Sequence, residues 1–306
     1  MKEKENLKAY LALFSIYIIW GTTYLAIRIG VKDLPPILFA GLRWLIAGPV
    51  LFTVLKMRGY SLPTKKDLIN LSIVGFLLIG IGNGLVVYSE QWIPSGLASL
   101  LITTVPFWIV GMEAVLPKGV RINLIVVLGL IFGMVGIGLI FGGDFKHLFN
   151  SENLGGVIGL MVAVFGWSLG TVYTKYKKTT VHPLMGASVQ MILAGVMLTL
   201  FGLLLGEGSS FHFTSNSLIA FIYLIVFGSL IGFGSYIYAI EHLPISLVST
   251  YAYVNPIIAL FLGWWILGEE ISFTIIISAL VILGGVALVK KGSSPRKIKF
   301  IGKDQK

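Results

Sequence analysis

The sequence predicts an all-α integral membrane protein with ten transmembrane helices, arranged as two inverted repeats of five helices each. Three observations lead to this fold class. Of the 306 residues, 56% are hydrophobic and only 12% are charged, whereas a soluble domain carries about 25% charged residues. Apolar runs of membrane-spanning length recur along the chain, and landmark residues of the first half return in the second half.

Ten apolar runs are long enough to cross a bilayer, because a helix of about 20 residues spans the hydrocarbon core. The charged residues 1–10 precede the first run without a small-residue cleavage site, so this run is expected to be a retained helix rather than a signal peptide. The predicted spans lie near 10–30, 35–56, 68–89, 94–116, 122–141, 154–175, 183–206, 217–240, 244–267 and 272–290.

Basic residues predict the orientation of these spans, since Lys and Arg concentrate in cytoplasmic loops. If the N-terminus is cytoplasmic, only Arg28, Lys32 and Lys146 fall in outer loops, while Arg43 lies within a span. The rest of the 23 basic residues then fall in cytoplasmic segments. We therefore predict a multi-pass protein of the plasma or inner cell membrane with both termini in the cytoplasm. The same distribution predicts contact with anionic lipid at the cytoplasmic face rather than binding of nucleic acid.

The two halves of the chain share landmarks at a nearly constant spacing. Trp20 and Trp167 are 147 positions apart, and Pro106 and Pro256 are 150 positions apart. Each half holds five spans, an odd number, so the second half must lie upside down relative to the first. The predicted domains are two inverted repeats and a basic cytoplasmic tail, at 1–145, 150–290 and 291–306.

Pro106 and Pro256 occupy matching places in the fourth and ninth spans. A proline inside a helix removes a backbone hydrogen bond and kinks the helix. In lipid, the freed carbonyl group must find a partner or face a cavity. Since inverted-repeat transporters bind substrates near the midplane, where the repeats meet, the matched prolines predict a shared central cavity. The alternative is that both prolines only adjust helix packing.

Two stretches carry a family resemblance: "SEQWIPSGLASLLITTVP" at 89–106 and "YAYVNPIIALFLGWWILGEE" at 251–270. Together with the two five-helix halves, they resemble the EamA family of the drug/metabolite transporter superfamily over residues 10–290. The resemblance implies ten helices, cytoplasmic termini, and export of small metabolites, amino acids or toxic compounds. One departure weakens any shared role for Glu269, because the first half has Lys118–Gly119 where the second half ends in Gly268–Glu269.

Ionisable residues inside a membrane are costly, so each is a candidate functional residue. Arg43 in the second span is expected to meet a carboxylate or an anionic substrate group; the alternatives are a structural ion pair and snorkelling. Glu90 lies seven residues after Asn83, on the same helical face, and is the first candidate for proton or cation coupling. The alternative is that Glu90 is an interfacial residue without a transport role. Glu113 is the next candidate for coupling. The acidic residues expected to be structural are Glu241, Glu269 and Glu270.

Hydroxyl, amide and aromatic side chains supply the remaining candidates for a substrate cavity. Such groups give an apolar pocket stacking faces and a few orienting hydrogen bonds. The predicted cavity residues are Trp20, Thr23, Asn83, Thr103, Thr104, Trp167, Thr171, Tyr253 and Asn255. Taken one at a time, each is also compatible with helix packing or with an interfacial anchor.

No catalytic residue, metal site or cofactor is expected. The chain has no cysteine, and its four histidines all fall in or near loops. It lacks the phosphate-binding Gly–Lys–Ser/Thr loop of an ATPase. The "GGDF" stretch at 142–145 lies in an expected outer loop, without a catalytic domain around it.

These observations together predict a secondary-active permease, not an enzyme, that exports a small molecule by alternating access around a central pocket. A proton gradient or the gradient of the substrate itself would drive it. The alternative is an intramembrane enzyme acting on lipids or lipid-linked precursors, which would need a deep cluster of acids, histidines or a nucleophile. Substrate identity, transport direction, coupling ion and oligomeric state stay open.

Overall fold

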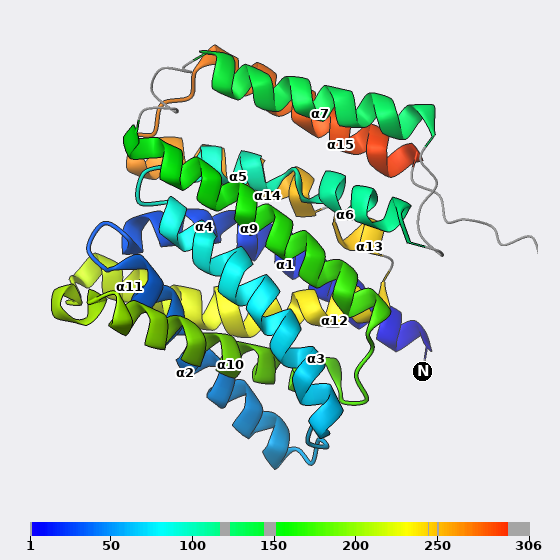
Figure 1. Ribbon diagram of the computed structural model, residues 1–306, viewed down its shortest axis with the longest axis vertical. Coiled ribbons are helices and arrows are strands. Elements are labelled where there is room, and N and C mark those ends of the chain that lie inside the picture. The colour runs from blue at the N-terminus through cyan, green and yellow to red at the C-terminus, as the bar shows by residue number, and fades with distance from the viewer. Residues whose placement is uncertain (1, 117–122, 144–150, 244, 250, 293–306) are drawn as a thin grey trace, which may run out of the picture.

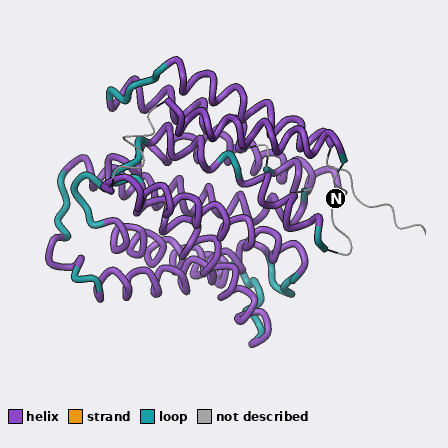
Figure 2. The backbone as a smooth tube through the Cα atoms, turned by 45° about the horizontal axis from the view of Figure 1, so that its top comes forward, coloured by secondary structure: helices purple, strands orange, loops and turns teal. Residues whose placement is uncertain are grey.

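The computed structural model describes residues 2–116, 123–143, 151–243, 245–249 and 251–292, and every regular element in this part of the chain is a helix. Figure 1 shows long helices that cross the molecule side by side. Figure 2 shows that most of the loops lie at the ends of these helices.

The ten predicted spans correspond in order to the helices of the described residues. The spans that are single helices are α1 (Lys2–Gly30), α2 (Pro36–Met57), α7 (Leu124–Gly143), α9 (Ser151–Tyr176), α10 (Pro183–Leu204) and α15 (Phe273–Gly292). The composite spans are α3 (Lys65–Gly75) with η1 (Phe76–Asn83) and α4 (Gly84–Ser89); α5 (Ser95–Ile102) with α6 (Val105–Ala114); α11 (Ser215–Tyr223) with η3 (Leu224–Phe233) and α12 (Gly234–His242); and α13 (Ile245–Val248) with α14 (Tyr251–Leu267). Within the described residues, seven helices are long and apolar enough to cross a membrane, and three shorter apolar helices accompany them. The predicted all-α membrane fold is confirmed.

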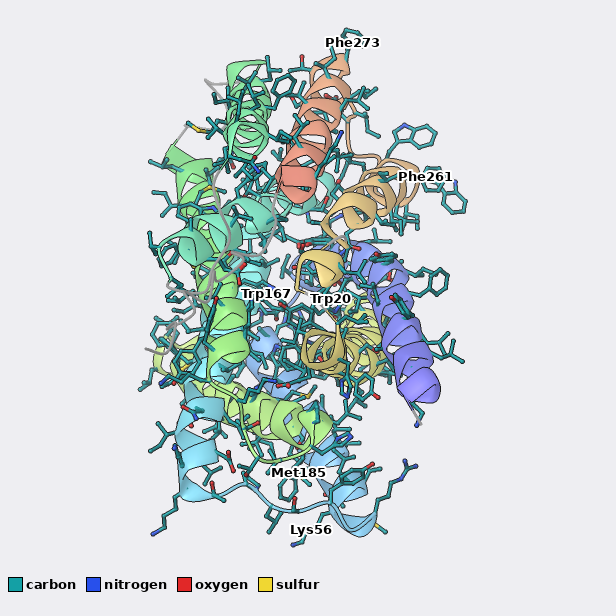
Figure 3. All side chains as sticks on the ribbon, turned by 90° about the vertical axis from the view of Figure 1, so that its right-hand side faces the viewer. Trp20, Lys56, Trp167, Met185, Phe261 and Phe273 are labelled. Atoms are coloured by element: carbon teal, nitrogen blue, oxygen red, sulfur yellow. The ribbon has the colours of Figure 1, made fainter. Side chains whose placement is uncertain are left out.

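The outside of the bundle is apolar. Met134 is 70% exposed, Trp265 67% and Leu280 65%, and Figure 3 shows Phe261 projecting outward from α14. Soluble proteins rarely expose large contiguous apolar patches, whereas side chains on the outside of a membrane bundle face lipid tails. The chain is therefore a multi-pass membrane protein.

Helices that occupy the same place in the two halves pack against each other. The most extensive contacts join α2 to α10 and α7 to α15, and the second pair lies along one edge of the molecule in Figure 1. Gly48 and Gly195 permit the first contact. A Cβ atom on Gly48 would lie 2.7 Å from the backbone nitrogen of Ile192, and one on Gly195 would lie 2.5 Å from that of Leu45. Small residues thus let the two backbones approach closely.

The third and eighth spans share an uncommon local structure. Each begins at a threonine, Thr64 or Thr214, whose hydroxyl accepts a hydrogen bond from the backbone N–H three residues further on. Each then passes through a π-helix, η1 or η3, before it continues as α4 or α12. Because π-helical turns are rare and are frequent at functional sites, their recurrence at equivalent positions directs attention to the centre of the bundle.

The two proline-containing spans are interrupted at different places, which differs from the predicted pair of matching kinks. Pro106 lies in the first turn of α6, a position that tolerates proline. Thr103 and Thr104 lie between α5 and α6, and their hydroxyls donate to carbonyl oxygens of α5 at 3.0 and 2.7 Å. Pro256 lies inside α14, and the ninth span is interrupted earlier, between α13 and α14.

Candidate functional site

A cavity lies between helices of both halves. The first half contributes α1, α2, α5 and the junction of η1 with α4, while the second half contributes α9, η3 and α14. Its walls are largely aromatic, formed by Trp20, Tyr24, Trp44, Trp167, Phe233 and Tyr251. A concave, mostly apolar space with a few polar groups is typical of small-molecule sites.

Trp20 and Trp167 meet in the middle of the bundle, with their ring centroids 5.3 Å apart and their planes at 80° (Figure 3). Each indole packs against a glycine in the π-helix of the other half. A Cβ atom on Gly232 would lie 2.6 Å from Nε1 of Trp20, and one on Gly82 would lie 2.9 Å from Cε3 of Trp167. The two glycines, 150 positions apart, therefore make room for the two tryptophans in an equivalent way.

Arg43 is the charged residue among the described residues that line the cavity, and only 2% of its surface is exposed. Its Nη2 donates to Oδ1 of Asn83, and the same oxygen accepts from Nε1 of Trp44 at 3.0 Å. The guanidinium carbon lies 4.5 Å from the centroid of the Trp44 ring, within the range of a cation–π interaction. Asn83 in η1 thus fixes two neighbouring side chains of α2.

The structure brings together part of the predicted site. Trp20, Thr23, Asn83, Trp167 and Arg43 all line the cavity. As a group they come from four separate spans, so the fold rather than local sequence unites them.

Thr171 lies outside the cavity, in a buried contact beneath the tryptophans. Its hydroxyl donates to the carbonyl oxygen of Trp167 at 2.7 Å, and the hydroxyl of Tyr236 lies 2.7 Å away. The Tyr236 ring in turn packs on Trp20, with centroids 5.0 Å apart. Thr171 therefore supports the tryptophan pair from the side of Tyr236 and has no contact with the cavity itself.

Three further predicted cavity residues are used by the backbone. Thr103 and Thr104 bond to carbonyl groups of α5, and neither lines the cavity. Asn255 is buried, and its amide, oriented with Nδ2 toward α1, donates to the carbonyl oxygen of Tyr17 at 3.0 Å. The Asn255 side chain therefore ties α14 to α1. The side chain of Tyr253 lies outside the described residues.

Glu90 follows the last residue of α4 and is fully buried. Neither of its carboxyl oxygens has a hydrogen-bond partner within the described residues, and it is not part of the cavity wall. Burial raises the pKa of the Glu90 carboxyl well above its usual range, and the nearby charge of Arg28 only partly opposes this. Arg28 also donates to the backbone carbonyl of Glu90.

Other carboxylates make structural contacts. Glu113, a predicted coupling residue, forms an ion pair with Lys175 between α6 and α9, and this pairing accounts for its charge. Glu269 accepts from the backbone N–H groups of Ser95 at 2.8 Å and Gly96 at 3.2 Å, at the N-terminus of α5. A carboxylate there satisfies free N–H groups and complements the helix dipole.

Equivalent contacts fasten the two ends of the bundle. We call the end where α1 begins the terminal face, and the other end the opposite face. At the terminal face, Asp67 accepts from the backbone N–H and the hydroxyl of Thr180, at 3.0 and 2.7 Å. At the opposite face, the hydroxyl of Thr214 donates to Asp33 at 2.5 Å. These are the terminal clasp and the opposite clasp, and each joins the start of α3 or α11 to a loop of the other half.

Several cavity residues were missed by sequence reasoning, namely Tyr24, Trp44, Phe233 and Tyr251. Each lies one or two residues from a predicted site residue or from a glycine that recurs in both halves. An aromatic residue in an apolar span does not by itself indicate a cavity. Gly82 and Gly232 did carry one, since they lie 150 positions apart in the spans that bear the other landmarks.

The fold and the central cavity together define a polytopic membrane protein of the transporter type. The model of the EamA-like transporter family matches residues 7–142 and again residues 154–290. The chain belongs to the EamA-like transporter family.

Similar proteins are transporters by name. A relative from Escherichia coli (strain K12), described as the uncharacterized inner membrane transporter YedA, is 35% identical over 293 residues, which are 95% of this chain and 94% of the relative. The uncharacterized transporter YoaV of Bacillus subtilis (strain 168) is 27% identical over 95% of this chain and 99% of its own length. One solved crystal structure shares the fold, with a TM-score of 0.68 and 22% identity over 92% of this chain and 96% of that chain.

Proposed function

We propose that this protein is a secondary-active exporter that moves a small metabolite by alternating access through the central cavity. The observation that carries this proposal is a pair of equivalent contacts, Trp20 against Gly232 and Trp167 against Gly82, which we call the glycine seats. Each half supplies one indole and one π-helical glycine to the same site. Two halves that are equivalent but inverted offer two states of similar energy, which alternating access requires.

Aromatic side chains close the cavity on one side. Toward the terminal face, Tyr236 and Tyr251 pack against Trp20, with ring centroids 5.0 and 5.3 Å from it. Thr171 and the terminal clasp lie further in the same direction. We take this arrangement as a state in which the substrate has no path to the terminal face.

The basic residues indicate on which side of the membrane the cavity is closed. If the terminal face is cytoplasmic, as the distribution of Lys and Arg favours, the closed side of the cavity is the cytoplasmic side. In an exporter of the plasma or inner membrane, this state would be the one that releases the metabolite toward the opposite face.

Labelled counterflow in proteoliposomes tests the proposal. Vesicles containing the full chain are loaded with unlabelled compounds and exposed to the ¹⁴C-labelled forms of a panel of amino acids and aromatic carboxylates. We expect protein-dependent uptake of at least one member, reduced about tenfold or more by Trp20→Ala, because a large stacking surface is removed. Trp264→Ala is the matched control, since Trp264 is 54% exposed on the outside of α14. Equal uptake by both variants would contradict the proposed pathway.

Glu90 is proposed as the site of proton coupling, because it is fully buried, neither carboxyl oxygen has a hydrogen-bond partner within the described residues, and burial raises its pKa above the usual range. As the pH falls through this pKa, Glu90 binds a proton and loses its attraction to Arg28. Glu90→Gln imitates the protonated form at every pH and is expected to flatten the pH profile of exchange while the protein stays folded. Glu270→Gln, in an exposed loop, should keep the wild-type profile. An unchanged profile in Glu90→Gln would rule out this role.

A further inference from the structure

Arg43 is a buried cation whose hydrogen-bonding capacity is largely unused. Its guanidinium group carries five N–H donors, and within the described residues its one hydrogen bond runs from Nη2 to Asn83. The Nε atom is fully buried and has no partner among the described residues. An unsatisfied donor on a buried charge is costly, so the position of Arg43 in the cavity wall calls for an acceptor that the protein itself does not supply.

No carboxylate of the described residues neutralises Arg43 by contact. The side chains that line the cavity include no Asp or Glu. The nearest acidic group in electrostatic terms is Glu90, which interacts more strongly with Arg28 than with Arg43. Glu113 is paired with Lys175, and Glu269 with the N-terminus of α5. The cavity therefore carries a positive charge and offers a cationic ligand no counter-ion.

The surroundings of Arg43 hold its guanidinium plane in place. Asn83 bonds to it, and the ring of Trp44 lies beneath it at 4.5 Å. Trp44 is itself fixed by its bond to Asn83 and by an edge contact with Phe233, whose centroid is 5.4 Å away. A guanidinium group that is fixed in this way is pre-organised for a planar anion, because two parallel N–H groups match the two oxygens of a carboxylate.

The remainder of the cavity suits a flat apolar body. Trp20 and Trp167 stand nearly perpendicular to each other in its wall, and Tyr24 and Tyr251 add further ring faces. Aromatic ligands gain from edge-to-face and offset contacts with such rings. The charged end and the aromatic walls belong to one space, so one molecule can use both.

We propose that the cavity binds aromatic carboxylates, with the carboxylate on Arg43 and the ring among Trp20, Tyr24 and Trp167. This substrate class rests on the proposed transport function for its biological meaning, but binding itself does not require transport. The site discriminates by charge: an anion gains the free N–H groups of Arg43, an isosteric amide gains less, and an amine is repelled.

A matched series of indoles tests this assignment. Indole-3-acetate is an anion, indole-3-acetamide is neutral, tryptamine is a cation and tryptophan is a zwitterion. Binding of tritiated indole-3-acetate to the purified full chain in detergent is measured by scintillation proximity, and the other three compounds serve as competitors. We expect indole-3-acetate to bind about 10- to 100-fold more tightly than indole-3-acetamide, the contribution of hydrogen bonds to a charged group. Tryptophan should bind less tightly than the anion, and tryptamine least tightly of all.

Variants then assign the preference to Arg43. Arg43→Gln should bind indole-3-acetate and indole-3-acetamide within about threefold of each other, whereas Arg43→Lys, which keeps the charge but not the paired N–H groups, should retain part of the preference. Arg58→Gln is the matched control, because Arg58 is exposed at the end of α2. The ranking of the four indoles on the unmodified chain needs no variant and stands even if Arg43→Gln fails to fold.

Three results would overturn the assignment. They are equal affinity of the unmodified chain for indole-3-acetate and its amide, an anion preference that survives in Arg43→Gln, and no binding of either indole-3-acetate or the smaller benzoate. Charge-selective binding without counterflow would leave the site in place and reject the transport function. Counterflow of an amine or a neutral compound that does not depend on Arg43 would support the transport function and reject the aromatic-carboxylate site.

Discussion

The two clasps are the same contact built twice, with the acid and the hydroxyl exchanged. In the terminal clasp the acid, Asp67, belongs to α3 and the hydroxyl, Thr180, belongs to the loop after α9. In the opposite clasp the acid, Asp33, belongs to the loop after α1, and the hydroxyl, Thr214, precedes α11. Asp33 and Thr180 are 147 positions apart, so they are equivalent residues of the two halves.

The exchange makes the two clasps unequal. Asp67 is buried and also accepts from the backbone N–H and the hydroxyl of Thr64, at 3.0 and 2.7 Å, so four hydrogen bonds converge on one carboxylate. The opposite clasp joins the two halves through one hydrogen bond from an exposed hydroxyl. Of the two clasps, the terminal clasp is therefore the stronger contact between the halves.

Asp67→Ala is expected to have the largest effect, because it removes both bonds of the terminal clasp and the two bonds from Thr64 at the start of α3. The chain has no cysteine, so a single Val248→Cys reports access from the terminal face without background. Val248 is 1% exposed and lines a small pocket with Thr171 and Tyr236. When Asp67→Ala is added, the rate at which Val248→Cys reacts with a charged methanethiosulfonate reagent in detergent should rise about tenfold or more, because hydrogen bonds to a charged group are lost.

Lys66→Ala is the control for this variant, because Lys66 is the exposed neighbour of Asp67 and makes no part of the clasp. Its labelling rate should match that of the unmodified chain. If Asp67→Ala left the rate unchanged while the protein stayed folded, the terminal clasp would not hold that face closed.

The two glycine seats offer a second, intermediate comparison. Gly232→Ala and Gly82→Ala each push a methyl group against a cavity tryptophan, at 2.6 and 2.9 Å. Overpacking of this kind costs about 1–3 kcal/mol, so each variant should slow counterflow roughly five- to tenfold, and Gly232→Ala somewhat more. Gly138→Ala, where a Cβ atom would meet nothing within 4 Å, should have no effect. A defect in only one of the two seats would show that the halves do not share the site equally.

Thr214→Val should have the smallest effect, because it removes one exposed hydrogen bond at the opposite face. A hydrogen bond in water contributes little, so labelling of Val86→Cys, which lines the cavity, should rise about twofold or less. The same reagent and conditions as for Val248→Cys allow the two faces to be compared directly. A tenfold rise would mean that the opposite clasp is as important as the terminal one.

The fold was largely predictable, because bilayer thickness sets the length of each apolar run and repeated landmarks reveal the two halves. The site was predictable where the repeat marked it, as with Trp20 and Trp167. The prolines were a weaker guide to the cavity: Pro106 lies in the first turn of α6, after the break in its span, and the hydroxyls of Thr103 and Thr104 bond to carbonyl groups of α5 at that break.

What could not be predicted depends on packing between distant spans. No local sequence rule signals the π-helical form of η1 and η3. The seating of Trp20 on Gly232 joins residues more than two hundred positions apart. The pairing of Glu113 with Lys175 likewise became visible only when α6 and α9 were placed together.

Reciprocal access to the cavity is the most direct test of alternating access. Labelling of Val86→Cys and Val248→Cys is measured in parallel, each with Asp67 intact and with Asp67→Ala. If the two faces open alternately, loss of the terminal clasp should raise the rate at Val248→Cys and lower the rate at Val86→Cys in the same protein. A rise at both positions would indicate general loosening of the bundle and would contradict transport by alternating access.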